Sequence, residues 1–147
     1  MSTDTAPVPT AVAAPAPASS WDVNAWVEAL YGGAVDHKDA AGFAAVFAED
    51  AWMRFGNAEP VIGRDAIEVA IAHFFTLFQG LHHDFTAIWA PDDAVILEGD
   101  VTYTRFDGST VSMPFTTILR LTAPGSGIVR RAQMYLDLTP LFAPTSA

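Results

Sequence analysis

The chain has 147 residues, and its 17 acidic side chains outnumber 7 basic ones, which gives a formal net charge of −10. Hydrophobic residues make up 51% of the sequence, so the chain can bury one ordinary core and is not disordered as a whole. The acidic balance excludes nucleic-acid partners, which need a basic stripe, and it argues against an anionic membrane surface. Because cysteine is absent, disulfides and thiolate chemistry are excluded.

Residues 1–20 differ in composition from the rest, because they are rich in Ala and Pro and carry one charge, Asp4. This composition predicts a flexible tail rather than a secretory signal, which needs a basic start and an unbroken apolar run. The expected organisation is one folded domain at residues 21–142 with a short tail at 143–147. No apolar run reaches the ~20 residues that cross a bilayer, so we expect a cytoplasmic protein.

The first half of the domain predicts three helices, since apolar residues recur there with helical spacing. Asp22 and Asp39 are the expected N-caps, and Gly80 is the expected stop after the third helix. The predicted helices cover residues 23–31, a short segment from Asp39 that includes Phe43, Val46 and Phe47, and residues 64–79.

The second half predicts four strands, because β-prone segments alternate there with turn residues. Asp107-Gly108 is a typical hairpin dipeptide between the second and third strands. The predicted strands cover residues 83–89, 95–106, 111–121 and 128–138. Helices followed by a long antiparallel meander indicate an α+β fold.

Alternation along the strands predicts which side chains face inward. Odd positions from Val95 to Tyr103 and from Val111 to Leu121 are mainly apolar, so they form the expected inner face. If the last strand keeps this phase, its inward residues are Val129, Arg131, Gln133, Tyr135 and Asp137. A single bulge would invert that phase.

Three segments together resemble a known family: Tyr31 to Asp39 continuing through Phe47-Ala-Glu-Asp-Ala51, Val61 to Ile67, and Tyr135-Leu-Asp-Leu138. With the order of helices and strands, residues 21–141 resemble the SnoaL-like branch of the nuclear transport factor two-like superfamily. The resemblance implies a cone-shaped, curved antiparallel sheet wrapped around helices, with an internal pocket. It does not imply one activity, because enzymes, binders and transport factors share this scaffold.

Two enzyme groups of this superfamily are similar in part. Tyr31 matches the oxyanion-stabilising tyrosine of ketosteroid isomerases, but Phe55 stands where their base would be, so isomerase chemistry of that kind is rejected. Asp137 and Asn57 are similar to residues that activate and hold water in limonene-epoxide hydrolase. Gly99 and Val101 stand where that enzyme's arginine and second aspartate would fall, so its exact mechanism is not expected.

Two further groups leave the reaction open. Asp137 is similar to the single inward aspartate of SnoaL-type polyketide cyclases, and Tyr31 with His83 resembles the tyrosine–histidine pair of scytalone-dehydratase-like enzymes. We therefore predict Asp137, Tyr31 and His83 as the catalytic residues. An inward Asp137 would be desolvated, which would raise its pKa into a range useful for proton transfer.

Each candidate has a structural alternative. Asp137 would otherwise be a solvated residue at a strand end or the partner of Arg131, Tyr31 a core tyrosine, and His83 a histidine at the sheet edge. His82 and His83 are adjacent on a strand, so both cannot line one pocket. No ligand spacing for a metal is present, and neither a metal nor a cofactor is expected.

A second set is predicted to bind substrate, because its members stand on the expected inner face, on the first helix or in a turn near Gly56. The set consists of Asn57, Phe55, Trp26, Tyr103, Met113, Phe115, Thr117, Gln133 and Tyr135. Asn57 has the alternative role of a plain turn residue. The aromatic members predict an apolar, ring-containing ligand of about 10–20 heavy atoms.

We expect a cofactor-independent general acid/base enzyme that acts on a small apolar carbonyl or cyclic compound. Ring closure, isomerisation, dehydration and epoxide opening all fit. The alternative is a non-catalytic ligand-binding or dimerisation module of the same fold. The chain is also predicted to form a homodimer through the outer sheet face, at positions Thr102, Thr104, Ile118, Ala132 and Met134.

Overall fold

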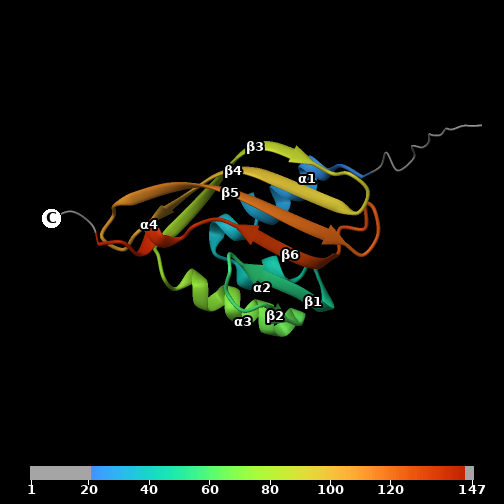
Figure 1. Ribbon diagram of the computed structural model, residues 1–147, viewed down its shortest axis with the longest axis horizontal. Helices are drawn as coiled ribbons and strands as arrows, with labels where there is room; N and C mark the ends of the chain where they lie inside the picture. The colour runs from blue at the N-terminus through green and yellow to red at the C-terminus, as the bar shows by residue number, and fades with distance from the viewer. Residues whose placement is uncertain (1–20, 145–147) are drawn as a thin grey trace, which may run out of the picture.

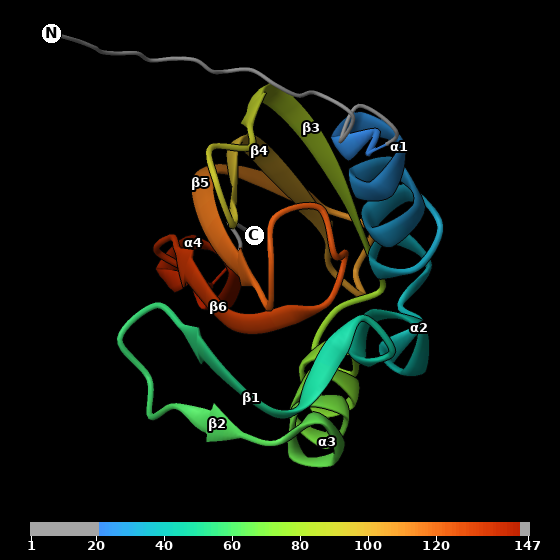
Figure 2. The ribbon, with the colours of Figure 1, turned by 90° about the vertical axis from the view of Figure 1, so that its right-hand side faces the viewer.

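The computed structural model describes residues 21–144, so the predicted tail at 1–20 lies outside the described residues, as do residues 145–147. Six strands form one curved, mixed sheet in the order β2-β1-β6-β5-β4-β3. Helices pack against its concave side, and Figures 1 and 2 show the sheet curling around them. This arrangement confirms the α+β class and the curved sheet that encloses helices.

The bounds of the elements are as follows. The helices are α1 (Val23–Val27), α2 (Ala40–Ala44), α3 (Arg64–Phe75) and α4 (Thr139–Phe142), with a π-helical turn η4 (Glu28–Gly32) and a 3-10 turn η5 (Val35–His37). The strands are β1 (Phe47–Phe55), β2 (Val61–Ile62), β3 (Gly80–Trp89), β4 (Ala94–Thr104), β5 (Thr110–Leu121) and β6 (Val129–Tyr135).

The helices begin where the sequence predicts, but they are shorter. Asp22 and Asp39 cap α1 and α2 by accepting hydrogen bonds from the N–H groups of Ala25 and Gly42, at 3.1 and 3.0 Å. After α1 the chain widens into the π-helical turn η4, which contains Tyr31. Such turns are rare and are found often at functional sites.

The first strand, β1, is not predicted from the sequence. The expected second helix ends at Ala44, and Phe47 begins β1 instead. Pairing with β6, which is distant in sequence, favours a strand over a helix here, because the carbonyl of Val46 accepts a hydrogen bond from the N–H of Val129, at 2.7 Å. Since β1 runs parallel to β6, the sheet is mixed rather than wholly antiparallel.

The side-chain phases of β4 and β5 agree with the alternation in the sequence. The buried residues of β4 include Val95, Leu97, Val101 and Tyr103, and those of β5 are the odd positions from Met113 to Leu121. On β6 the expected phase is wrong. Leu121 pairs with Val129 while Arg120 pairs with Arg131, so β6 carries one extra residue at this point. This bulge inverts every later side chain.

The inversion also corrects the expected outer face. Ala132 and Met134 point into the core, and their exposed fractions are 0% and 8%. Thr102, Thr104 and Ile118 are partly exposed and lie in the opposite phase to the buried residues of β4 and β5. Dimerisation through this face stays a prediction. In the described residues, no helix has the length and apolar character needed to cross a membrane.

Candidate functional site

A small cavity lies on the concave side of the sheet, between the first helical segment, α3 and strands β3 to β6. Its volume is about 50 Å³, and its wall is mostly aromatic and aliphatic. Four polar side chains face it, namely those of Tyr31, His83, Tyr103 and Thr117. Among residues 21–144, His83 is the only lining side chain that could carry a charge, so the cavity suits an uncharged ligand.

His83 is held in one orientation by Asp36. The Nδ1 atom of His83 lies 2.7 Å from Oδ1 of Asp36, and the backbone N–H of His83 donates to Oδ2 of the same carboxylate, at 3.2 Å. Both side chains are largely buried, with exposed fractions of 10% for His83 and 13% for Asp36. A carboxylate beside Nδ1 favours the tautomer that carries its proton there, which leaves Nε2 free to accept one.

The other nitrogen of His83 has no hydrogen-bond partner within residues 21–144. The imidazole lies edge-on to Phe115 and to Tyr31, with ring centroids 5.2 and 4.8 Å apart. These rings shield the imidazole from water and fix its plane. His82, the next residue on β3, is exposed and does not line the cavity, as the alternation of side chains predicts.

Tyr31 stands beside His83 on the helical wall. Its side chain is 5% exposed, and its hydroxyl shares a hydrogen bond with the hydroxyl of Thr117. Burial raises the pKa of Tyr31 well above its ordinary value; the bond to Thr117 opposes that shift, and the nearby Asp36 adds to it. Tyr31 therefore keeps its proton at any physiological pH and remains a hydrogen-bond donor.

Tyr103 is the second phenol of the cavity. It is 2% exposed, and its ring contacts the edge of Phe78 at a centroid distance of 4.8 Å. Burial, with a smaller electrostatic contribution from Tyr31, raises the pKa of Tyr103. The Tyr103 hydroxyl is thus also a permanent donor.

Asp137 does not occupy the place expected of it. The residue is exposed beyond the end of β6, where its carboxylate accepts a hydrogen bond from the N–H of Thr139, at 2.9 Å. The side-chain and backbone hydrogen bonds from Thr139 lower the pKa of Asp137, whereas an inward, desolvated carboxylate would have a raised pKa. The cause is the bulge in β6, which turns the later odd positions outward.

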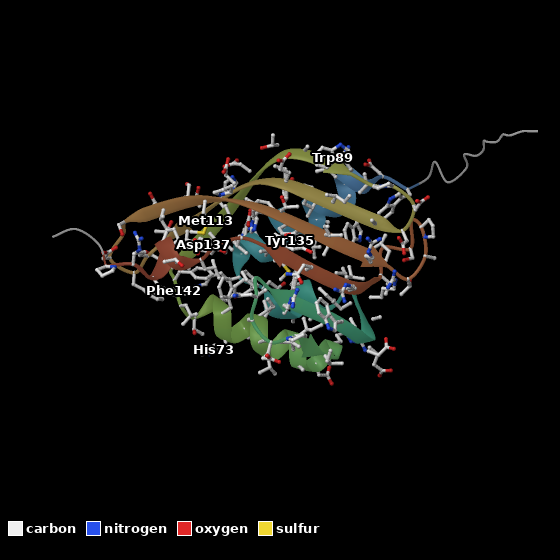
Figure 3. The ribbon with its side chains drawn as sticks, in the orientation of Figure 1. His73, Trp89, Met113, Tyr135, Asp137 and Phe142 are labelled. Carbon is white, nitrogen blue, oxygen red and sulfur yellow. The ribbon has the colours of Figure 1, made fainter. Side chains whose placement is uncertain are left out.

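Asp137 and Asn57 instead face an open cleft outside the cavity, beside α4. The cleft has a volume of about 550 Å³, and Figure 3 shows Asp137 near Phe142, which also lines it. Phe55 and Leu136 border both the inner cavity and this cleft. These two side chains therefore form the wall between the two spaces, and contact of Phe55 with a substrate stays a prediction.

Of the other residues predicted to bind substrate, Phe115 and Thr117 line the cavity and four do not. Met113 is buried in the core away from the cavity wall, and Tyr135 is 52% exposed (Figure 3). Trp26 packs against Trp21, at a centroid distance of 5.6 Å. Gln133 is buried but accepts a hydrogen bond from Nε of Arg54, at 2.8 Å.

Asp36 is the functional candidate that sequence reasoning missed. It stands in the Val35-Asp-His-Lys-Asp39 segment, which is part of the family resemblance, but nothing local distinguishes it from the other acids there. Its contact with His83 joins residues 47 positions apart. Within residues 21–144, no group of three or more His, Asp or Glu side chains is placed to bind a metal ion.

Comparison with known proteins gives a family and a fold. A family model described as a SnoaL-like domain matches residues 27–130. No curated protein matches the sequence. Among solved structures, a nuclear transport factor two-like protein of unknown function from Burkholderia pseudomallei is 15% identical with a TM-score of 0.69, covering 80% of this chain and 92% of that one.

Two other structures are similar to the same extent. A Jannaschia protein provisionally described as a SnoaL-like polyketide cyclase is 17% identical with a TM-score of 0.68, covering 91% of this chain and all (100%) of that one. A Catenulispora acidiphila protein with a ketosteroid isomerase-like fold, solved with trimethylamine, is 20% identical with a TM-score of 0.65, covering 80% and 85%. At these identities, the likeness supports the fold alone.

Proposed function

Since this chain belongs to the SnoaL-like domain family, we propose that it is a cofactor-independent acid/base enzyme for a small apolar carbonyl or cyclic compound. His83 is the proton-transfer group, Asp36 positions it, and Tyr31 donates a hydrogen bond to the substrate oxygen. The observation that carries the proposal is the 2.7 Å contact between His83 and Asp36 on the wall of an apolar cavity.

The chemistry follows from the roles of the two nitrogens of His83. With Nδ1 held by Asp36, Nε2 accepts a proton from the carbon next to the substrate carbonyl. The electron pair moves to the carbonyl oxygen, which accepts a hydrogen bond from Tyr31. Thr117 donates to the oxygen of Tyr31 in this state, which leaves the phenol proton for the substrate.

The imidazolium of His83 then returns the proton to the substrate. Return of the proton at another carbon is an isomerisation, and its return to a departing hydroxyl, which leaves as water, is a dehydration. If the enolate carbon first attacks a second carbonyl and closes a ring, the new alkoxide takes the proton. The charge of Asp36 stabilises the imidazolium through each of these outcomes. The choice among them depends on the substrate.

Proton exchange in heavy water tests the common first step. Cyclic ketones are incubated with the protein, and loss of the hydrogens next to the carbonyl is followed by NMR. His83→Gln should slow exchange by about 100-fold or more, which is the ordinary contribution of a general base. The matched control is His73→Gln, because His73 is exposed on α3 and does not line the cavity.

Asp137→Asn should leave the exchange rate unchanged, because Asp137 faces the outer cleft. An effect of Asp137→Asn as large as that of His83→Gln would contradict the assignment. So would equal exchange rates for the wild type and His83→Gln.

A second candidate function is ligand binding without chemistry. The mostly apolar lining supports it, because apolar contacts can bind a ring compound without any proton transfer. The cavity volume of about 50 Å³ is smaller than the ~300 Å³ of ordinary ligand pockets, so in either function a ring compound would have to displace wall side chains such as Phe55 and Leu136. Saturable binding of a cyclic ketone with no proton exchange above the His83→Gln rate would establish this second function.

A further inference from the structure

The Tyr103 hydroxyl belongs to one of the most deeply buried side chains of the cavity wall. The side chain is 2% exposed, yet the hydroxyl has no hydrogen-bond partner within residues 21–144. Tyr31, by contrast, shares its hydroxyl with Thr117. A buried hydroxyl that lacks a partner costs stability, and such groups are uncommon in folded proteins.

The ring of Tyr103 is fixed, so its hydroxyl cannot turn away to water. Phe78 and Phe74 meet it edge-on, at centroid distances of 4.8 and 6.1 Å. Phe78 is itself fully buried. Tyr103 lines the cavity, so a molecule bound there could supply the hydrogen-bond partner that the described part of the chain does not.

Tyr103 and His83 lie on the same inner face of the sheet. His83 pairs with Val101 across β3 and β4, and Tyr103 follows Val101 by two residues. Diagonal positions of this kind are separated by about 7–8 Å at their Cα atoms. Tyr103 is therefore close enough to contact the same small ligand as His83, at a different point of that ligand.

We propose that Tyr103 binds a second oxygen of the substrate, while Tyr31 and His83 contact the reacting carbonyl group. The proposal rests on the proposed function, because it takes the same cavity as the substrate site. It narrows the substrate class to uncharged ring compounds with two oxygen functions. The ring fits the aromatic wall, and the absence of charge fits the lining.

Two probes of matched shape test the proposal. Hydroquinone and para-cresol share one ring hydroxyl and differ at the other end, where hydroquinone has a hydroxyl and para-cresol a methyl group. Dissociation constants are measured by NMR titration for the wild type and for Tyr103→Phe. The matched control is Tyr135→Phe, since Tyr135 is exposed and outside the cavity.

The preference of the wild type for hydroquinone over para-cresol should fall about three- to tenfold in Tyr103→Phe, which is the range of one hydrogen bond. It should not change in Tyr135→Phe. An equal preference in the wild type and Tyr103→Phe overturns the proposal, and so does failure of the wild type to bind either probe at millimolar concentration.

A measurement on the free protein gives an independent answer. Removal of an unpartnered hydroxyl should leave the melting temperature of Tyr103→Phe equal to or above that of the wild type. A fall of several degrees would mean that the hydroxyl already has a partner, and it would overturn the proposal.

The His83→Gln variant separates this inference from the acid/base function. If proton exchange fails in the wild type but the hydroquinone preference depends on Tyr103, the acid/base function is wrong and the subsite stands. If proton exchange depends on His83 but the preference for hydroquinone is unchanged in Tyr103→Phe, the subsite is wrong and the acid/base function stands.

Discussion

His83 and Asp36 are 47 residues apart in the chain, yet the carboxylate of Asp36 forms hydrogen bonds with both the ring Nδ1 and the backbone N–H of His83. The 3-10 turn η5 brings Asp36 to the edge of β3, and Lys38 ends that turn in the left-handed conformation at φ 58°. Lys38 then donates a hydrogen bond to the carbonyl of Phe78, at 2.9 Å, which ties the turn to the segment that leads into β3.

Asp36→Asn should lower the proton-exchange rate by at least about tenfold, because the neutral amide cannot stabilise the imidazolium. The ¹⁵N chemical shifts of His83 provide a second measurement, since loss of the carboxylate should reduce the population with the proton on Nδ1. Asp84→Asn is the control, because Asp84 is exposed and contacts His82, at 3.2 Å. Unchanged shifts together with an unchanged rate would refute the positioning role.

Tyr31→Phe should destabilise the protein by about 1–3 kcal/mol, because it leaves the buried hydroxyl of Thr117 without its partner. Thr117→Val should act similarly. The double variant should recover most of that stability, since both polar groups are then gone. Denaturant unfolding measures the stabilities.

The double variant also separates stability from activity. Its proton exchange should stay as slow as that of Tyr31→Phe, because the donor to the substrate oxygen is absent. Recovery of exchange along with stability would show that Tyr31 has only a structural role.

Gly99→Ala should destabilise the protein by about 1–3 kcal/mol, in the range of overpacked cores. A Cβ at Gly99 would overlap the carbonyl oxygen of Asp84 and crowd Phe85, where β3 carries a bulge. The control is Gly80→Ala on the same strand pair, because no atom lies within 4 Å of a Cβ there. Equal unfolding free energies for the two variants would contradict this account.

Asp93→Asn should make stability less dependent on pH. A hydrogen bond from Arg130, aided by Arg120, lowers the pKa of Asp93 below its ordinary 3.8. Because the pKa is lower in the folded state, the carboxylate stabilises the fold above pH 3.8 and loses this effect as pH falls through the folded value.

The wild type should therefore be more stable than Asp93→Asn at neutral pH, and the difference should shrink as pH falls below 3.8 and vanish once the carboxyl is protonated in both states. Thermal unfolding across this range measures the difference. A gap that widens as pH falls would have the wrong sign.

The sequence by itself determined the α+β class, the helix N-caps at Asp22 and Asp39, and the inward phase of β4 and β5. These features depend on nearby residues. A cap acts within one turn, and alternation along a strand follows from the direction of successive side chains. The place of Tyr31 and His83 on the cavity wall also followed from local pattern and family resemblance.

The tertiary structure alone decided the phase of β6, the existence of β1 and the partner of His83. One extra residue beside Arg120 sends Asp137 outward, and no local pattern marks it. Pairing with β6 converts the end of the expected second helix into β1. Asp36 meets His83 only because the chain folds back, so its role depends on non-local contacts that periodicity along the chain does not encode.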